Sequence, residues 1–453
     1  MGLITLRQAA DWCGGWVDPK YENITFLGAS NDSRNIQPGQ LFVALKAERD
    51  GHDFIPAALG NGASAVLCTR TVGDHPAIVV EDTRLALGQI ARGERCRMGM
   101  TVVGVTGSVG KSTTKEMICD VLATQYRVGK TPANHNNDIG MPMAILSMEP
   151  DTQVAVLEMG MNHVREIAYL ADIAQPDVAV ITNIGTMHIE HLGSQQGILQ
   201  AKLEIIEGMK EGGRLVLNGD DALLWNQRNR HSIPLVYYGT QNPECRNLST
   251  ELHQEPSLLR FNARCGDETF AVVLPLEGMH YVSDAMAAVS VGLEMGISTE
   301  NICAALASFR NMEGRQEIFE AKGYTVIKDC YNAGPESMAA ALAVLGGRKG
   351  RKVAVLGDML ELGSSAPAEH YRIGRIAAEN ADVVLAYGPN SSRLISGALT
   401  GGMPPANARA FEDRDTMVAA MKHMLKEGDV VLVKGSRGMR MELILDKFLA
   451  EET

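Results

Sequence analysis

Residues 104–113 read GVTGSVGKST, and these residue types are suited to holding a phosphate group. An apolar run precedes the stretch and a helix-like run follows, so its glycines would let backbone N–H groups approach phosphate oxygens at the start of a helix. Lys111 would reach the β- and γ-phosphates, and the Ser112 hydroxyl would bind Mg²⁺. Val105 stands where the usual motif has its first glycine, so the loop is a variant. The predicted nucleotide triphosphate site comprises Thr106, Gly107, Ser108, Val109, Gly110, Lys111, Ser112 and Thr113.

Three further side chains could serve the same chemistry. Glu158 ends the apolar run VAVLE, and a carboxylate among apolar neighbours is costly unless it has a partner such as a metal ion. His188 lies in GTMHIEHLGS, where a histidine can be a metal ligand, an oriented donor or an ordinary loop residue, and the residues alone leave these open. Lys202 lies in LQAKLEI, where an exposed helix face is the ordinary interpretation for Lys202 and Glu204.

The order of elements around these residues predicts a parallel sheet. Apolar runs at 101–107, 154–160 and 177–185 alternate with helix-like stretches, a pattern typical of a sheet covered by helices on both faces. Residues 214–278 contain closely spaced strand-like runs and predict a mixed or antiparallel extension of the same sheet. A helical segment at about 281–309 ends this central domain.

The regions on either side predict two more domains. Short β-rich runs and turns in the first part indicate a small α/β domain, and the polar, basic stretch 91–100 is interpreted as a linker. The turn-rich stretch 311–317 is a hinge candidate. Beyond it, strand–helix alternation predicts a Rossmann-like domain whose ligands lie at the carboxyl ends of the strands. The predicted fold class is therefore α/β, with domains at 1–99, 100–312 and 313–453.

Composition limits the classes of partner. The 453 residues carry 42 Lys and Arg against 54 Asp and Glu, a formal net charge of −12, and no basic block marks a nucleic-acid site. The eight cysteines form no C-x-x-C pair, which indicates reduced thiols in the cytosol. No apolar run approaches the ~18 residues that a membrane helix needs. We expect a cytoplasmic protein with no nucleic-acid partner and no membrane insertion.

Taken together, the motifs resemble those of the Mur ligases, the ATP-dependent amide ligases of peptidoglycan precursor synthesis. They occur in the family's order over essentially the whole chain: TGSVGKST, Glu158, His188, Lys202 in AKLE, Arg315 in GRQE and Asp329 in KDCYNAGP. The resemblance implies three domains. These are a small N-terminal α/β domain for the uridine nucleotide, a central P-loop ATP-binding domain with a mostly parallel sheet, and a C-terminal Rossmann-like ligase domain.

Four stretches resemble the branch of the family that adds D-alanyl-D-alanine: DSRNIQPGQLFVALKAERDGHDF, NHNNDIGMP, YNAGPESM and GDMLELG. The first of them is shared with the sibling branch. The branch that adds diaminopimelate or lysine commonly carries a D-N-P-R signature, which this chain lacks. The resemblance therefore implies a monomer that uses UDP-N-acetylmuramoyl-tripeptide (UDP-MurNAc-tripeptide), D-Ala-D-Ala, ATP and two Mg²⁺ ions. Whether the third peptide residue is diaminopimelate or lysine stays open.

The resemblance also implies roles for individual residues. Ser112 and Glu158 would bind one Mg²⁺, and His188 with a carbamylated Lys202 would bind the second. The catalytic residues carried over are Lys111, Glu158, His188, Lys202 and Asp329. Further ATP contacts are Asp284, Arg315 and Asp329. The implied substrate contacts are Ser33 and Arg34 for the uridine nucleotide, Asn136, Asn137 and Asp138 for the muramoyl-peptide, and Tyr331, Asn332, Lys434, Ser436 and Arg437 for the dipeptide or the peptide carboxylate.

One motif departs from the family pattern. The helix on the ATP side commonly reads G-x-H-N-x-x-N-A in the family, whereas this chain has GMHYVSDA, with Tyr281 and Asp284 in place of two asparagines. An ionised aspartate accepts hydrogen bonds but cannot donate them. Either the backbone reads adenine here, or Asp284 accepts a hydrogen bond from the exocyclic amine.

The implied reaction is amide formation through an acyl phosphate. The peptide carboxylate attacks the γ-phosphate, and the dipeptide amine then displaces phosphate. Hinge closure near Gly314 would exclude water. The alternatives are the sibling ligase that adds a diamino acid, a folylpolyglutamate synthetase, a P-loop ATPase switch and a UDP-sugar sensor without chemistry. The DSRNIQPGQLFVAL stretch disfavours the synthetase, and the sensor is disfavoured by the intact Lys111, Glu158, His188 and Lys202.

Overall fold

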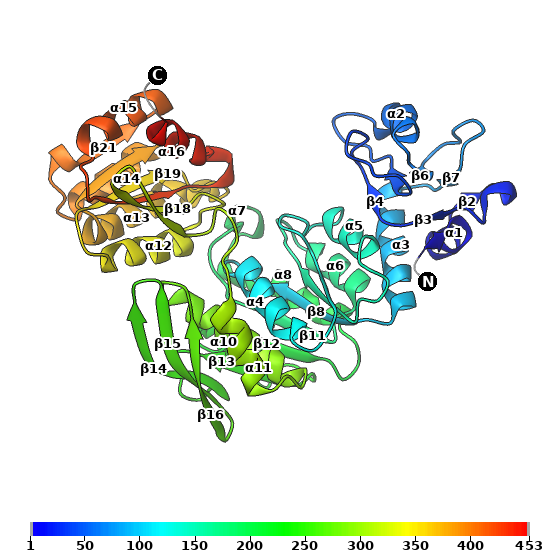
Figure 1. Cartoon of the computed structure of the whole chain (residues 1–453), viewed down its shortest axis with the longest axis horizontal. Helices are drawn as coiled ribbons and strands as arrows, with labels where there is room; N and C mark the ends of the chain where they lie inside the picture. The colour runs from blue at the N-terminus through cyan, green and yellow to red at the C-terminus, as the bar shows by residue number, and fades with distance from the viewer. Residues whose placement is uncertain (1–2, 451–453) are drawn as a thin grey trace.

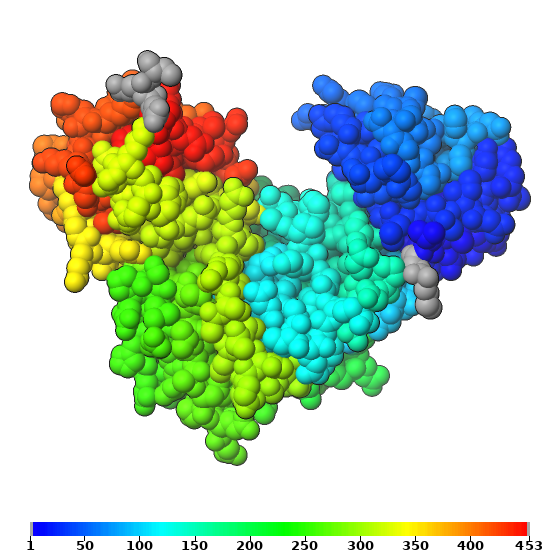
Figure 2. All heavy atoms as spheres, in the orientation of Figure 1, coloured from blue at the N-terminus to red at the C-terminus, as the bar shows by residue number. Residues whose placement is uncertain are grey.

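The computed structural model describes residues 3–450, which form three successive α/β domains (Figure 1). The predicted α/β class with three domains is confirmed. In the view of Figure 2, the N-terminal and C-terminal domains both lie above the central domain, with a broad hollow between them. The boundaries 1–99, 100–312 and 313–453 stay predictions.

The N-terminal domain is built on a five-stranded sheet of order β2-β7-β6-β5-β4. The pairs from β4 to β7 are parallel, and β2 is antiparallel to β7. The sheet strands are β2 (Trp16–Val17), β4 (Ala29–Ser30), β5 (Leu41–Val43), β6 (Ala65–Cys68) and β7 (Ala77–Val79). Two further strands, β1 (Ile4–Thr5) and β3 (Thr25–Phe26), form a separate antiparallel pair. The helices of this domain are α1 (Leu6–Cys13), α2 (Ile55–Gly60) and α3 (Thr83–Met98).

The prediction of a linker at 91–100 is wrong, because α3 continues to Met98 and ends at Gly99, whose φ of 66° closes the helix. The charges that suggested a linker are satisfied within the fold. Glu94 is buried and pairs with Arg97. Arg95 is also buried and donates 2.7 Å to the carbonyl of Gln175 in the central domain. The helix therefore leads into the central domain and contacts it directly.

The central domain has a nine-stranded sheet of order β16-β15-β14-β13-β12-β11-β8-β10-β9. Alternate residues of its middle strands enter separate cores: Val102 packs on one face, and Val103 and Val105 on the other. Such two-sided burial explains why these strands are apolar throughout. The parallel strands are β8 (Thr101–Thr106), β9 (Val128–Lys130), β10 (Val154–Glu158), β11 (Val178–Ile181), β12 (Arg214–Asn218), β13 (Leu235–Gly239) and β14 (Asn247–Glu255).

The predicted extension over 214–278 is confirmed. Two antiparallel strands, β15 (Leu258–Cys265) and β16 (Glu268–Leu274), complete the edge of the same sheet. The predicted final helical segment is also present, as α10 and α11. The central helices are α4 (Lys111–Ala123), α5 (Gly140–Leu146), α6 (Glu166–Ala174), α7 (Ile189–Leu192), α8 (Gln195–Leu203), α9 (Ala222–Trp225), α10 (His280–Glu294) and α11 (Thr299–Ser308).

The C-terminal domain has a six-stranded sheet of order β17-β18-β22-β19-β20-β21, parallel except for the β17–β18 pair. Because β22 lies between β18 and β19, the chain crosses over at this point, where open α/β sheets bind ligands. The strands are β17 (Glu317–Ala321), β18 (Tyr324–Asp329), β19 (Lys352–Gly357), β20 (Val383–Tyr387), β21 (Ala408–Phe411) and β22 (Val430–Lys434). The helices are α12 (Pro335–Gly347), α13 (Ala366–Asn380), α14 (Ser391–Thr400), α15 (Arg414–Met424) and α16 (Glu442–Leu449).

Two observations bear on the environment of the chain. All eight cysteines are free thiols, and burial raises the pKa of Cys119 to about 12, which keeps this thiol protonated. Along residues 3–450, none of the helices combines the length and the apolar character that crossing a membrane requires.

Candidate active site

A pocket of about 530 Å³ lies between the central and C-terminal domains. On the central side its wall is the loop after β8 and the end of β10, and on the C-terminal side it is the ends of β18 and β22. The predicted residues that line it are Ser108, Val109, Gly110, Lys111, Ser112, Thr113, Asn136, Asn137, Glu158, His188, Lys202, Asp284, Arg315, Asp329, Tyr331, Asn332 and Lys434. Residues far apart in the sequence thus converge on one cavity.

The phosphate loop connects β8 to α4. Gly107 and Gly110 have φ values of 151° and 82°, and a Cβ at Gly107 would lie 1.9 Å from Thr182 Oγ1, so glycine is required there. Lys111 begins α4, and its Nζ donates to the carbonyls of Gly107 and Ser108 at 2.8 and 3.2 Å. Burial lowers the pKa of Lys111, and the positive charge of Arg315 lowers it further. The negative charge of the nearby Glu158 acts in the opposite direction.

Glu158 ends β10, which pairs with β8 so that Glu158 lies opposite Val105. The residue is 4% exposed, and its Oε1 accepts 2.9 Å from Asn136 Nδ2. Its backbone N–H donates to Thr131 Oγ1 at 2.9 Å. The carboxylate is therefore placed beside the phosphate loop by strand pairing, as its sequence position after an apolar run had suggested.

Lys202 lies on α8 and is 2% exposed, so the interpretation of 202 and 204 as an exposed helix face is wrong. Burial lowers the pKa of Lys202 well below its usual value, and the positive charge of Lys111 lowers it further. Glu204 is buried too, and its carboxylate accepts from the backbone N–H groups of Arg165 and Ala168 at the start of α6. Lys202 lies in α8, and Glu204 begins the 3₁₀ turn that follows it. This stretch packs against α6, α7 and α9, and that packing has no local sequence signal.

His188 precedes α7 and has a left-handed backbone, with φ of 63°. Its Nδ1 lies 2.9 Å from Oε2 of Glu361, a residue of the C-terminal domain. The neighbouring imidazole lowers the pKa of the Glu361 carboxyl. The histidine therefore faces an acid from another domain at the edge of the pocket.

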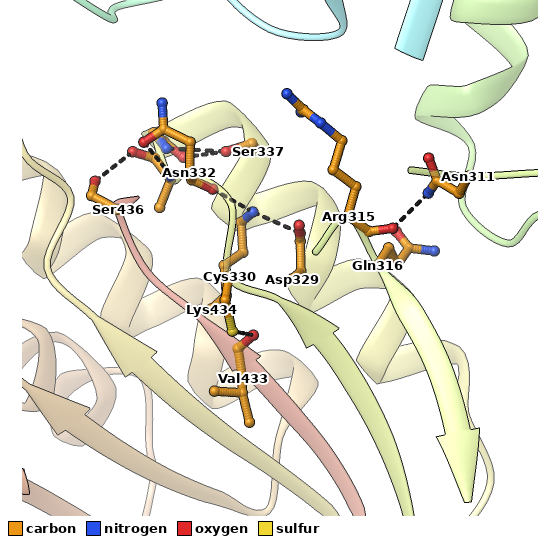
Figure 3. A network of polar contacts seen from close by, with 12 residues as sticks. Asn311, Arg315, Gln316, Asp329, Cys330, Asn332, Ser337, Val433, Lys434 and Ser436 are labelled. Carbon is orange, nitrogen blue, oxygen red and sulfur yellow. Dashed lines mark hydrogen bonds and ion pairs between the residues drawn. The ribbon is translucent and has the colours of Figure 1, made fainter. Parts of the chain in front are cut away.

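The C-terminal domain supplies cations to the same pocket. Arg315 Nη2 donates to Ser112 Oγ at 2.9 Å, and the guanidinium lies over the Tyr331 ring at 4.0 Å. Lys434 at the end of β22 contacts Asp329 Oδ2 at 2.6 Å and the carbonyl of Asn332 at 3.0 Å (Figure 3). These contacts bring the two strand ends together at the crossover point.

Other predicted residues lie outside the pocket lining. Ser33 is buried in the N-terminal domain, while Arg34 is exposed and pairs with Asp32. Asp138 lies 3.1 Å from Arg84 of α3. Ser436 is buried, donating to the carbonyl of Ala333 and accepting from the N–H of Leu360, whereas the Arg437 side chain is exposed.

Asp284 contacts the phosphate-binding helix. Its Oδ1 accepts 2.9 Å from Thr114 Oγ1, and the carboxylate packs against Gly110. Burial raises its pKa to about 7, with Thr114 and Arg315 acting in the opposite direction. These contacts favour a supporting role for Asp284 beneath the phosphate loop.

Sequence reasoning missed four residues at the domain interface. They are Asn134, Thr186, Glu336 and Glu361. Thr186 donates its backbone N–H and hydroxyl to Glu336, each at 3.0 Å, and the predicted Tyr331 donates to Asn134. Both glutamates belong to stretches singled out in the sequence, YNAGPESM and GDMLELG, but nothing local showed which side chain would reach the central domain.

Comparison with known proteins shows that successive parts of the chain match models of one family. Family models match in order: Mur ligase family, catalytic domain, over residues 23–95; Mur ligase middle domain over 105–292; and Mur ligase, glutamate ligase domain, over 314–437. A UDP-N-acetylmuramoyl-tripeptide–D-alanyl-D-alanine ligase of Bacillus subtilis is 40% identical over 451 residues, covering 97% of each chain.

Solved structures agree with this result. A crystal structure of MurF from Acinetobacter baumannii is similar with a TM-score of 0.91 and 32% identity, covering 99% of each chain. MurF ligase from Thermotoga maritima in complex with ADP gives a TM-score of 0.84 at 31% identity, covering 93% of this chain and 97% of that one. The chain therefore belongs to the Mur ligase family, within which UDP-N-acetylmuramoyl-tripeptide–D-alanyl-D-alanine ligases are its full-length relatives.

Proposed function

We propose that the chain joins D-Ala-D-Ala to UDP-MurNAc-tripeptide in peptidoglycan precursor synthesis, with hydrolysis of ATP to ADP and phosphate. The observation that carries this proposal is the single pocket in which a phosphate loop faces the ligand-binding strand ends of a second α/β domain. Full-length similarity to ligases of that name supports the choice of substrates.

The chemistry requires activation of a carboxylate, because a free carboxylate has no adequate leaving group for attack by an amine. The terminal carboxylate of the tripeptide attacks the γ-phosphorus in line, forming a C–O–P linkage and releasing ADP. The dipeptide amine then attacks the acyl carbon, the C–O bond breaks, and phosphate leaves with the oxygen. The amine loses one proton as the amide forms.

The cationic side chains match the charges of these steps. Lys111 lies where β- and γ-phosphates would be held by the loop, and Arg315 reaches Ser112 from the other domain. Asp329 and Lys434 pair at the far wall of the pocket. We assign Lys111 and Arg315 to the binding of ATP. We assign the Asp329–Lys434 pair to the position where the ATP site meets the dipeptide site.

The donor set fits Mg²⁺. Within residues 3–450, no three His, Cys, Asp or Glu side chains form a metal cage, and Mg²⁺ usually binds one or two carboxylates together with substrate phosphates. Ser112 and Glu158 follow neighbouring strands and offer a hydroxyl and a buried carboxylate. Bound there, the ion would offset negative charge on the phosphates. His188 and a carbamylated Lys202 would hold a second ion.

Lys202 has the environment that carbamate formation needs. Burial and the Lys111 charge favour its neutral amine. A neutral amine adds to CO₂, forming an N–C bond and releasing a proton, and the product carries a carboxylate. The residue would thereby change from a buried base into an oxygen ligand.

The remaining assignments follow the position of each domain. Ser33 and Arg34 would contact the uridine nucleotide. Asn136, Asn137 and Asp138 would contact the muramoyl-peptide. The dipeptide or the peptide carboxylate would meet Tyr331, Asn332, Lys434, Ser436 and Arg437.

The reaction is placed in the cytoplasm, where ATP and nucleotide-linked precursors are available. We further infer that the protein acts as a monomer with domains at 1–99, 100–312 and 313–453. Gly314, with φ of 73°, lies in the connection between α11 and β17 and is the proposed hinge.

The first prediction concerns substrate dependence. We expect phosphate release from ATP with UDP-MurNAc-tripeptide to require D-Ala-D-Ala, and the nucleotide product to gain the mass of that dipeptide. Parallel reactions receive diaminopimelate, lysine or no amine as controls. Phosphate release that does not depend on the dipeptide would contradict the proposal. Release that requires diaminopimelate or lysine would indicate a ligase that adds a diamino acid.

The second prediction concerns Lys202. We expect Lys202→Ala to lower kcat by about 100-fold or more, since loss of a group that orders a metal site has effects of this size. Short-chain carboxylic acids should restore part of the activity by supplying the missing carboxylate. The exposed Lys426→Ala is the control. Full activity of Lys202→Ala without added acid would refute the carbamate role.

The third prediction concerns Arg315, whose guanidinium bridges two domains. Hydrogen bonds to charged groups contribute about 1.5–3 kcal/mol, so Arg315→Ala should raise the KM for ATP about 10-fold or more. Arg372→Ala is the matched control, because Arg372 pairs with Glu369 at the surface of α13 and such pairs contribute little. An unchanged KM for ATP in Arg315→Ala would remove Arg315 from the ATP site.

A further inference from the structure

The C-terminal domain holds one short segment of the central domain from two sides. This segment, residues 185–190, follows β11, contains His188 and runs into the start of α7. On one side, Glu336 near the start of α12 accepts hydrogen bonds from the Thr186 N–H and hydroxyl, each at 3.0 Å. On the other side, Glu361 Oε2 lies 2.9 Å from His188 Nδ1.

Close backbone packing accompanies both acidic contacts. A Cβ at Gly334 would lie 2.9 Å from Met187 Cγ, and a Cβ at Gly363 would lie 2.8 Å from Glu190 Cβ. Two glycines of the C-terminal domain thus allow its loops to approach the 185–190 segment. The contact is a fitted interface rather than a single ion pair.

The two residues that meet at this interface both have left-handed backbones. His188 and Glu361 each have φ of 63°. Histidine tolerates this region better than most residues, whereas a glutamate there is uncommon. Such conformations persist where the surrounding structure determines them, and they gather at functional sites. The Glu361 backbone is therefore the unusual one of the facing pair.

The acid also faces one particular ring nitrogen of His188. Glu361 Oε2 lies 2.9 Å from Nδ1, although the pair is not aligned as a regular hydrogen bond. Because a carboxylate only accepts hydrogen bonds, this contact favours hydrogen on Nδ1. Nε2 is then the nitrogen with a free lone pair, and a second-shell acid of this kind is the usual means of orienting a histidine. The orientation depends on the C-terminal domain, because Glu361 is the partner of His188 among the ion pairs of residues 3–450.

We propose that Glu361 and Glu336 are positioning residues: docking of the C-terminal domain brings both carboxylates onto the 185–190 segment and thereby orients His188. This inference rests on the proposed function for its kinetic consequence only. Arrival of the dipeptide-binding domain and assembly of the catalytic pocket become one event, so the site is complete only when both domains are in contact.

The test compares substitutions that differ in one acceptor oxygen, in the full-length protein. We expect Glu361→Ala and Glu336→Ala to lower kcat about 10- to 100-fold, the usual effect of removing an orienting partner. Glu361→Gln and Glu336→Gln retain an acceptor oxygen and should recover most of that loss. Glu369→Ala in the same domain is the control, because Glu369 pairs only with Arg372 among the described ion pairs.

A readout independent of turnover is the ¹⁵N NMR spectrum of the histidine-labelled protein, with the His188 signals assigned from His188→Gln. We expect hydrogen on Nδ1 in the wild type and a shift toward the other tautomer in Glu361→Ala. Unchanged His188 signals in Glu361→Ala would overturn the inference, as would equal loss of kcat in Glu361→Ala and Glu361→Gln. If the wild type makes no pentapeptide product from D-Ala-D-Ala, the proposed function fails, and the NMR comparison still decides the orientation of His188.

Discussion

The burial of Lys202 is the constraint around which the pocket is arranged. Lys202 is 2% exposed, and after burial the strongest influence on its pKa is the positive charge of Lys111. Two ammonium groups in a shared environment of low dielectric constant repel each other, so the pocket favours a neutral amine at position 202. Conversion of that amine to a carbamate would replace a repulsive contact with an anion that balances Lys111. The phosphate loop and α8 are thus linked by charge across the pocket that both line.

Division of the pocket between two domains suits the proposed acyl phosphate, which water would destroy. The phosphate loop and Glu158 belong to the central domain, whereas Arg315 and Lys434 belong to the C-terminal domain. Contacts that cross the interface, such as Arg315 with Ser112, both hold the domains together and complete the set of charges. The hollow between the N-terminal and C-terminal domains leaves room for a long nucleotide substrate (Figure 2).

Local sequence patterns predicted the parts of the site that depend on one strand and its following turn. The phosphate loop follows β8, and Glu158 ends the adjacent parallel strand β10. Because the carboxyl ends of adjacent parallel strands lie at one edge of a sheet, the sequence predicted that the two lie side by side. This reasoning failed for Lys202, because the burial of α8 depends on its tertiary packing. Composition misled at 91–100, where Glu94 and Arg95 look solvent-exposed but have buried partners. Glu336 and Glu361 could not be found at all, since their contacts join residues 150 or more positions apart.

The most direct test of the account follows one oxygen atom. UDP-MurNAc-tripeptide labelled with ¹⁸O in its terminal carboxylate is incubated with ATP and D-Ala-D-Ala, and the released phosphate is examined by mass spectrometry. An acyl phosphate passes one carboxylate oxygen to phosphorus, so we expect one ¹⁸O atom in the phosphate for each amide formed. Unlabelled phosphate alongside the pentapeptide product would contradict carboxylate activation, and with it the role given to the pocket.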